Sequence, residues 1–499
     1  MITRELIFSI CNEGNEAVFQ FISALVQQNT LVLSQNVALL EQNKIQDEKA
    51  LALEARILEL ETSLKKDSSN SSKPPSTDGY KKKPVSLRQS NLKKPGGQQG
   101  HPGKTLAFVD EPDHIRLHEP AACLGCGVSL KDAPGSTLEK RQVTDLPQPP
   151  VEVTEHHLRQ IQCPCCGLLN QGAFPENVSQ PVQYGSRIKS LATYLTHFQM
   201  IPYGRVAAFL SDMFGLSISK ATLYEAQKTC SMRLEPMLDK IKEMLVNSKV
   251  VGFDETGMRA GGSLRWLHAA STSKFTHFHW YESRGKEGTD AGGIFPAFNG
   301  VAVHDAWHPY WNYSTRHALC NAHHLRELKG LFQQTKQEWA SSMIELLVRM
   351  KRAVAKAVSH GDCSLAPEIL KSFMNEYDVL LEAGFTLNPA AQKPLIKKKG
   401  RVKQSDAYNL LRRLKERKTE TLRYVTNFDV PFDNNQAERD IRMIKVKQKV
   451  SGCFRTTDGL RDFCRIRSCI LTLQKQETSI LESLKHVFEN NFHFSFQPA

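Results

Sequence analysis

The chain has 499 residues, enough for several domains and at least one large buried core. It carries 65 Lys and Arg against 52 Asp and Glu, a formal net charge of +13 at pH 7, which favours a polyanionic partner such as a nucleic acid. No stretch approaches the roughly 20 apolar residues that a membrane helix needs, and early acidic residues such as Glu5 and Glu13 argue against a secretion signal. We therefore expect a cytoplasmic protein, in which paired cysteines indicate a metal rather than a disulfide.

The N-terminal residues are predicted to form a coiled coil. From Val32 to Leu64 a heptad pattern recurs in alternating steps of four and three residues. Asn36 and Asn43 fall at a-type positions, where a buried Asn can fix the register and a two-stranded state. A single amphipathic helix packed on its own domain is the alternative; we favour a coil that joins copies of the chain.

A basic segment follows, rich in Ser, Pro, Gly and Lys. It holds too few apolar side chains to form a core, so we expect a flexible linker. Such a linker either lies along DNA without reading its sequence or makes no contacts.

Two cysteine pairs predict a structural zinc ribbon. Cys123 and Cys126 form one CxxC knuckle followed by Gly, and Cys163 and Cys166 form the second. Four thiolates from two knuckles can close a tetrahedron around one Zn²⁺, which leaves no open position for catalysis. Cys165 is a surplus thiol that could replace Cys163 or Cys166. Strands are expected between the knuckles, at Val151-Glu152-Val153 and at residues 158–162.

The next region resembles a helix-turn-helix. Residues 203–214 and 220–229 are predicted to be helices, with Gly215 ending the first in a left-handed conformation. Ser217 or Ser219 would cap the second helix, which would enter a major groove of DNA. An ordinary helical hairpin is the alternative.

The chain then changes to short strands, followed by a mostly helical stretch from Leu325 to about Leu422 with a loop around Leu387 to Val402. The predicted strands are residues 249–253, 265–270, 275–281, 300–304 and 316–320.

Three acidic residues far apart in the sequence have the setting of metal ligands. Asp254 and Asp305 each end an apolar run that we predict to be a strand, and Glu438 lies in the first turn of a predicted basic helix. An acid at the end of a buried strand is costly unless it is paired or bound to a metal. Two Asp on strands and one Glu on a helix suit two Mg²⁺ ions with hard oxygen ligands. This order, with a helical insertion before the Glu, is the layout of a ribonuclease-H-like nuclease core.

The helix of Glu438 is also expected to contact DNA. Arg442, Lys445 and Lys449 recur on nearly the same face, so one helix could supply a metal ligand and a row of phosphate contacts. Side chains of the 433–435 segment are expected to cap its first turn.

Two other patterns compete with this interpretation. His277 and His279 with Tyr281 resemble the signature of nucleases that use a tyrosine nucleophile, but that reading leaves the three carboxylates unexplained. Cys320 and His323 have ligand-like spacing without an obvious second pair, so we expect a packed Cys and a capping or DNA-facing His.

Taken together, these residues resemble the large transposase of the IS66 family of bacterial insertion sequences over nearly the full length of the chain. The resemblance implies a DDE transposase whose acids fall on Asp254, Asp305 and Glu438, with an all-helical insertion before the Glu. It also implies binding to terminal inverted repeats and two small accessory proteins of the same element. Cys165 departs from the pattern. The matching stretches are the heptad helix, the two knuckles and residues 70–79, 97–103, 254–257, 304–307, 317–323 and 433–439.

We therefore expect a multidomain α+β DNA transposase that uses Mg²⁺ (or Mn²⁺) for strand cleavage and strand transfer, holds a structural Zn²⁺, and acts as a homodimer or larger assembly in the bacterial cytoplasm, associated with the nucleoid. A zinc-ribbon and helix-turn-helix regulator without catalysis is the rival. The expected regions are a coiled coil (1–66), a basic linker (67–112), a zinc ribbon (113–182), a helix-turn-helix-like region (183–247), a ribonuclease-H-like core (248–330 and 425–475) with a helical insertion (331–424), and a C-terminal helix and tail (476–499).

Overall fold

The protein is a mixed α+β chain, and its computed structural model describes residues 3–64, 66–67, 70–71, 108–145, 151–391, 402–492 and 496. Most of the linker predicted at 67–112 lies outside these residues. The chain divides into two compact units, which are Met1–Lys82 with Asn321–Lys418 and Lys83–Cys320 with Thr419–Ala499. Within the described residues, no helix combines the length and the apolar character needed to cross a membrane.

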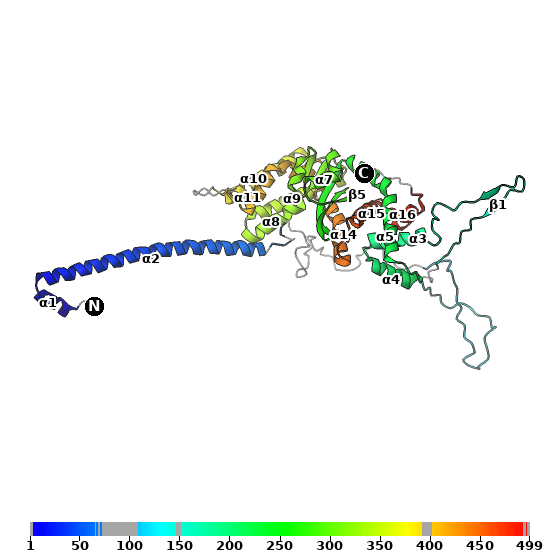
Figure 1. Ribbon diagram of the computed structural model, residues 1–499, viewed down its shortest axis with the longest axis horizontal. Coiled ribbons are helices and arrows are strands. Elements are labelled where there is room, and N and C mark those ends of the chain that lie inside the picture. The colour runs from blue at the N-terminus through cyan, green and yellow to red at the C-terminus, as the bar shows by residue number, and fades with distance from the viewer. Residues whose placement is uncertain are drawn as a thin grey trace. The chain divides into compact units, whose positions relative to one another are not determined.

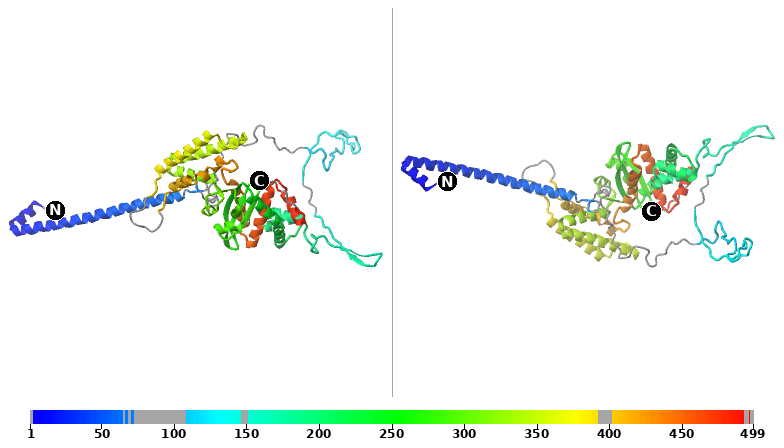
Figure 2. Two further views of the ribbon diagram at one scale, coloured as in Figure 1. Left: turned by 90° about the horizontal axis from the view of Figure 1, so that it is seen from above. Right: turned by 90° about the horizontal axis from the view of Figure 1, so that it is seen from below.

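The N-terminal part of the first unit is helical. A short helix, α1 (Arg4–Asn12), is capped by Thr3, whose hydroxyl accepts the Leu6 N–H at 3.3 Å. It is followed by α2 (Asn15–Leu64), a continuous helix of 50 residues (Figures 1 and 2). Helix formation over the predicted coiled-coil segment is thus confirmed, and its pairing with a second chain stays a prediction.

The remainder of the first unit is the helical stretch that the sequence predicted. Its core is built from amphipathic helices that bury Trp339, Leu346 and Leu411, and Tyr377 donates a hydrogen bond to the Leu414 carbonyl at 3.0 Å. The first helix begins at Asn321, earlier than expected. These helices are α8 (Asn321–Thr335), α9 (Glu338–Ser359), α10 (Pro367–Leu387) and α11 (Asp406–Glu416).

The second unit is organised around a mixed sheet, which within the described residues has five strands in the order β5-β4-β3-β6-β7. The first three form an antiparallel meander, whereas β6 runs parallel to β3 and β7 runs parallel to β6. The strands are β3 (Val250–Ala260), β4 (Ser263–Ser271), β5 (Thr276–Tyr281), β6 (Val301–His304) and β7 (Arg316–Leu319).

Both faces of this sheet are covered. On β3, Val251 and Phe253 point into a core shared with α5, α6 and α15, while Met258 and Ala260 point into a core shared with α14 and α15. Side chains alternate between the faces of a strand, so Gly252 and Asp254 lie on the face that receives α14. The short elements between the strands are α7 (Lys286–Ala291) and the 3₁₀ turns at Phe295–Ala297 and His308–Asn312. The later helices are α12 (Lys418–Thr421), α13 (Arg423–Thr426), α14 (Asn435–Ser451), α15 (Thr457–Lys475) and α16 (Ile480–Glu489).

The N-terminal part of the second unit holds the cysteine knuckles and a group of helices. A small hairpin pairs β1 (Gln160–Gln162) with β2 (Leu169–Gln171). The helices are α3 (Ser186–Thr193), which continues as a π-helical turn at Tyr194–Phe198, α4 (Tyr203–Phe214), α5 (Lys220–Arg233) and α6 (Glu235–Val246).

Two strand predictions were wrong in detail. We expected a strand to end at Phe253, with Asp254 just beyond it, but β3 runs on to Ala260 because residues 252–260 pair with β4. We also expected a strand at Val151-Glu152-Val153, which is described and lies in neither a helix nor a strand. Alternation alone does not make a strand when no neighbour pairs with it.

Candidate active site

Parallel pairing brings the first two predicted acids to the same level of the sheet. Val250, Val251 and Gly252 of β3 pair with Val301, Ala302 and Val303 of β6. Asp254 and Asp305 each follow the last of these pairs by two residues. Neighbouring residues of an in-register pair share a face, so the two carboxylates emerge side by side toward α14.

The turn after Asp305 holds an unusual backbone conformation. Ala306 has φ of 71°, a left-handed value that costs a residue with a Cβ free energy. Its N–H donates to His304 Nδ1 at 3.1 Å, and the Trp307 N–H donates to Asp305 Oδ1 at 3.0 Å. This turn fixes the orientation of the Asp305 carboxylate, which is exposed at the end of β6.

Glu438 comes to this edge on the first turn of α14, and Asn434 fixes where that turn begins. Of the 433–435 side chains that we expected to cap the helix, Asp433 accepts the Asn435 N–H on Oδ1 at 3.2 Å, whereas Asn434 donates from Nδ2 to the Phe253 carbonyl at 2.7 Å. The Asn434 carbonyl accepts the Glu438 N–H at 3.2 Å. Asn434 therefore connects the backbone next to Asp254 directly to the backbone of Glu438.

The close approach of α14 to β3 depends on Gly252. A Cβ added at Gly252 would lie 2.2 Å from Asn434 Oδ1, closer than non-bonded atoms can come. Gly252 and Asn434 together set the distance between the strand and the helix. No feature of the local sequence around Gly252 indicated this role, because its partner lies 182 residues further along the chain.

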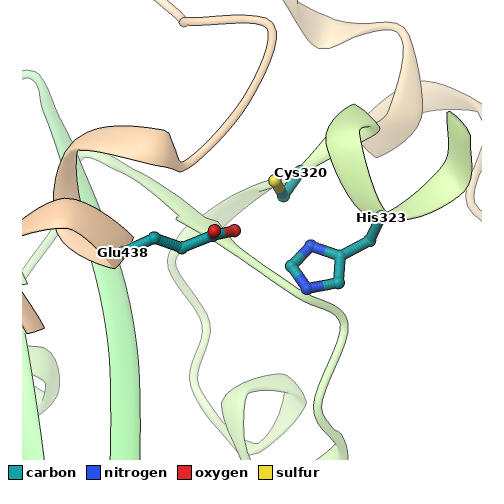
Figure 3. A group of neighbouring side chains, drawn as sticks. All are labelled: Cys320, His323 and Glu438. Carbon is teal, nitrogen blue, oxygen red and sulfur yellow. The ribbon is translucent and has the colours of Figure 1, made fainter. Parts of the chain in front are cut away.

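Cys320, the residue after β7, also borders Glu438. The buried Cys320 Sγ accepts the Asn434 N–H at 3.1 Å, and Figure 3 shows Cys320 and Glu438 as neighbours. Chain continuity puts His323 three residues later, in the first turn of α8. Among the described residues, these three form the one group of His, Cys, Asp or Glu whose possible ligand atoms all lie within 4.8 Å of one another. Sequence reasoning noted the spacing of Cys320 and His323 but missed the Glu.

The electrostatics of this site disfavour negative charge. Loss of hydration raises the pKa of Asp254 well above its usual value, and the neighbouring carboxylates of Glu255, Glu438 and Asp305 raise it further. Asp305 and Glu438 are therefore near enough to Asp254 to act on its charge, although the carboxylate oxygens of the three predicted acids do not all lie within 4.8 Å of one another. Such a group keeps its charge only if a cation neutralises it. Its donors are carboxylate oxygens, which suit Mg²⁺ or Mn²⁺.

A fourth acid, Glu255, is engaged by its own partners. It projects from the opposite face of β3, where the Arg284 Nε donates to it at 2.9 Å and Tyr310 donates its hydroxyl proton. The Arg284 guanidinium also lies over the rings of Trp307 and Trp266, at 4.2 and 5.2 Å from the ring centroids. Burial raises the pKa of Glu255, and the charge of Arg284 opposes that rise. These residues, which sequence reasoning missed, brace β3 against the turn that follows Asp305.

The basic residues of α14 differ from one another in their surroundings. Arg442 is exposed and pairs with Glu438 at 3.1 Å, and Lys449 is also exposed. Lys445 is half-buried and donates to the Gly257 carbonyl, and burial lowers the pKa of its ammonium group. Arg442 and Lys449 are therefore better placed for phosphate contacts than Lys445.

The two cysteine knuckles have the same local geometry. In each, the first Cys carbonyl accepts the N–H of a following Gly with positive φ, at 2.8 Å for Cys123 and 2.9 Å for Cys163. Hydrogen bonds from the neighbouring residues, chiefly the backbone of Cys126 and of Cys166, lower the pKa of Cys123 and Cys163. The structure does not gather the four predicted ligands within 4.8 Å of one another, so one shared zinc stays a prediction.

The two helices of the predicted helix-turn-helix are both present, as α4 and α5. Gly215 ends α4 with φ of 68°, and Ser219 caps α5 by accepting the Thr222 N–H at 3.0 Å. Ser219, rather than Ser217, is therefore the cap. Lys220 and Lys228 are exposed on α5, and contact of this helix with DNA stays a prediction.

The competing tyrosine-nuclease pattern is poorly placed for metal binding. His277 is buried in the sheet, and His279 lies with its Nε2 2.7 Å from the Gly288 carbonyl. The His279 ring stacks on that of His268 at 4.9 Å, and burial lowers the pKa of His268 to about 3 and that of His279 to about 4. These histidines are packing residues of the sheet.

Comparison with known families agrees with the resemblance. The family model described as "Transposase IS66 family" matches residues 181–462, more than half of the chain. A second model, for a family of unknown function, matches residues 23–107. No curated protein matches the chain.

Proposed function

Because the chain belongs to the transposase IS66 family and is therefore a DNA-modifying enzyme, we propose that it is a DDE transposase. It would bind the inverted-repeat ends of its insertion sequence and catalyse Mg²⁺-dependent strand cleavage and strand transfer. The observation that carries this proposal is that Asp305 and Glu438 both lie near enough to the buried Asp254 to raise the pKa of its carboxyl group.

The sheet would be a ribonuclease-H-like core. The antiparallel β3-β4-β5 meander followed by two parallel strands supports this assignment, as does the arrival of an acid from each of β3, the end of β6 and α14. Asp254, whose pKa both of the other acids raise, would help to hold both metal ions, and Asp305 and Glu438 would each help to hold one. When bound, the ions would activate a water or a DNA 3′-hydroxyl and stabilise the leaving oxygen.

The remaining residues of the site would orient the ligands and the DNA. Asn434 and Gly252 hold Glu438 at its distance from Asp254, and Arg284 keeps Glu255 out of the ligand set. Arg442 and Lys449 would contact phosphates beside the reacting bond, with Lys445 as a weaker candidate.

The other modules would serve DNA recognition and assembly. We assign α4 and α5 to a helix-turn-helix and Cys123, Cys126, Cys163 and Cys166 to a structural zinc ribbon, because each has the local geometry of its class. The long α2 would join two chains so that both element ends are held together. Two small accessory proteins of the same element are further expected partners.

Supercoiled plasmid that carries the element ends tests the proposal. The purified chain should nick this DNA with Mg²⁺ or Mn²⁺ but not with EDTA. Asp254→Asn, Asp305→Asn and Glu438→Gln should each reduce nicking by roughly a thousandfold or more, because each ligand contributes several kcal/mol of transition-state stabilisation. Binding to the ends in a gel-shift assay should persist.

Asp458→Asn is the matched control, since Asp458 is an exposed acid paired with Arg461 on α15. It should nick as the wild type does. A wild-type protein that shifts the DNA but never nicks it would instead identify the non-catalytic regulator. A covalent protein–DNA adduct would identify a tyrosine nucleophile.

A further inference from the structure

Two buried histidines lie behind the turn that follows Asp305. His304 is the last residue of β6 and His317 lies on β7, and the two residues are 0% and 8% exposed. Their ring centroids are 5.1 Å apart, and His304 Nε2 lies 3.0 Å from His317 Nδ1. A buried polar ring is costly unless its nitrogens have hydrogen-bond partners. The partners of the four ring nitrogens therefore decide what this pair can do.

The hydrogen bonds around the pair fix the position of each ring proton. The backbone N–H of Ala306 can only donate, so His304 Nδ1, 3.1 Å away, is the acceptor and bears no proton. The ring proton of His304 is then on Nε2, which donates to His317 Nδ1 at 3.0 Å. His317 in turn bears its proton on Nε2 and donates it to the Tyr313 carbonyl at 3.2 Å. A chain of three hydrogen bonds thus runs from the Ala306 backbone through both rings to the Tyr313 backbone.

This arrangement leaves neither ring a nitrogen with which to bind a metal ion. A histidine binds a metal through an unprotonated nitrogen, and that nitrogen already accepts a hydrogen bond in each ring. His304 also shares its face of β6 with Ala302, which is buried in the core that contains Val251 and Phe253, on the side of the sheet away from α14. The two rings can therefore act on the acidic site only through the backbone.

The backbone that His304 reaches is the strained residue of the turn. Ala306 has φ of 71°, and both of its backbone groups are held in this left-handed conformation. Its N–H donates to His304 Nδ1, and its carbonyl accepts from Trp311 Nε1 at 3.4 Å. The next N–H along the chain, that of Trp307, donates to Asp305 Oδ1 at 3.0 Å. The hydrogen bond between Ala306 and His304 therefore stabilises the conformation in which the turn orients the Asp305 carboxylate.

The other end of the hydrogen-bond chain is anchored in the sheet. His317 pairs with Ala302 across β6 and β7, and its own carbonyl accepts from Arg423 Nε at 2.6 Å. Trp311 packs against both rings, with centroids 4.6 Å from that of His317 and 5.2 Å from that of His304. Because strand pairing, hydrogen bonds and ring contacts fix both histidines, the sheet determines where His304 Nδ1 lies.

We propose that His304 and His317 are positioning residues for the Asp305 carboxylate. As two neutral rings, each protonated on Nε2, they attach the Ala306 turn to the sheet and so set the direction in which Asp305 meets a metal ion. The catalytic part of this inference rests on the proposed function, because it takes Asp305 to be a metal ligand. The hydrogen-bond chain itself does not depend on that function.

Two substitutions of His304 separate positioning from packing. The Asn side chain can place an oxygen where His304 Nδ1 lies, so His304→Asn keeps an acceptor for the Ala306 N–H but does not reach His317. The longer side chain of His304→Gln reaches His317 but leaves the Ala306 N–H without its acceptor. His304→Gln should lower the nicking rate and weaken Mn²⁺ binding, each about 10–100-fold, whereas His304→Asn should lose less than about threefold. Packing alone predicts the reverse order, because Asn leaves the larger cavity. The reverse order, or equal effects of the two variants, would overturn the proposal.

Mn²⁺ binding to the full-length chain is measured without DNA, from the electron paramagnetic resonance signal of the unbound ion, so this readout does not depend on catalysis. Binding to the element ends in a gel-shift assay should stay as in the wild type. His360→Gln is the control, since His360 is an exposed histidine just after α9. It should match the wild type in nicking and in Mn²⁺ binding.

The hydrogen-bond chain can also be tested without the proposed function. Nitrogen-15 NMR of the histidine-labelled wild-type chain at neutral pH reports which ring nitrogens bear protons. The signals of His304 and His317, identified by their loss in His304→Asn and His317→Asn, should both show a protonated Nε2 and an unprotonated Nδ1. A proton on Nδ1 of either ring would overturn the proposal. A wild-type chain that shows this pair of tautomers but does not nick DNA would reject the proposed function and leave the hydrogen-bond chain in place.

Discussion

The long N-terminal helix and the edge of the sheet each hold side chains in an unfavourable environment, but the environments are opposite. Helix α2 exposes apolar side chains such as Leu53 and Leu60 to water, whereas the sheet edge buries the carboxylate of Asp254 near those of Asp305 and Glu438. We propose that a second apolar helix would cover the exposed side chains of α2, and that a cation would neutralise the acids. The exposed apolar groups of α2 and the buried acid of the sheet edge therefore indicate the kind of partner that we expect each region to bind.

The difference also shows in how each region holds its own shape. Helix α2 is held by hydrogen bonds between residues near one another in the sequence, so changes there should affect the proposed assembly and leave the sheet folded. The sheet edge depends on contacts between segments that are far apart in the sequence. Three long-range or local contacts of the second unit test this contrast, from the largest expected effect to the smallest.

The buried ion pair beneath α14 should have the largest effect on stability. Asp440 accepts from Lys475 Nζ at 2.7 Å, from the Ser271 hydroxyl at 2.7 Å and from the Thr276 hydroxyl at 2.9 Å, and both charged side chains are at most 10% exposed. Lys475→Met would leave the Asp440 charge without its cation, at a cost of about 3 kcal/mol. Urea unfolding of the sheet-containing unit measures this loss. The exposed pair of Lys249 and Asp429 provides the control, Lys249→Met, which should cost far less. Equal losses for the two variants would contradict the account.

The contact between Asn434 and Gly252 should affect catalysis more than folding. Asn434→Ala removes the bond to the Phe253 carbonyl, and Gly252→Ala puts a methyl group against Asn434 Oδ1, so each should lower the nicking rate about 10–100-fold with DNA binding unchanged. The double variant should be no slower than Asn434→Ala alone, because the clashing oxygen is gone.

Gly285→Ala is the control for the glycine, since a Cβ at Gly285 would meet nothing within 4 Å. Its nicking rate should equal that of the wild type. Additive losses in the double variant would show that Asn434 and Gly252 act separately, and would remove their proposed role in placing Glu438.

The cap of α5 should have the smallest effect. Ser219→Ala removes the side-chain oxygen that accepts the Thr222 N–H and should cost about 1 kcal/mol. Ser217→Ala, two residues earlier, should change stability by less. Hydrogen exchange at the start of α5 distinguishes them, and a larger effect at Ser217 would contradict the assignment of the cap.

The sequence predicted the elements of the site better than their contacts. The apolar runs before Asp254 and Asp305 indicated β3 and β6, and Gly215 indicated the end of α4, because these signals are local. The continuation of β3 beyond Asp254 was missed, since it arises from pairing with β4.

Contacts between segments that are far apart in the sequence could not be predicted from local sequence patterns. Asn434 is of a residue type that often caps helices, but its side chain makes no cap hydrogen bond and donates from Nδ2 to the Phe253 carbonyl instead. Nothing in the sequence around Arg284 indicated its role, because that role depends on contacts with Glu255 and with two tryptophans that lie elsewhere in the sequence. The strand predicted at Val151-Glu152-Val153 was wrong for the opposite reason, because the local alternation was present but no neighbouring strand pairs with it.

The most direct test of the central claim is a crystal structure soaked in Mn²⁺, with anomalous scattering recorded at the manganese edge. We predict manganese within about 2–2.5 Å of carboxylate oxygens of Asp254, Asp305 and Glu438, and its loss from crystals of Asp254→Asn. Manganese bound elsewhere, or an unchanged peak in the Asp254→Asn crystals, would contradict the claim that these three acids form the catalytic metal site.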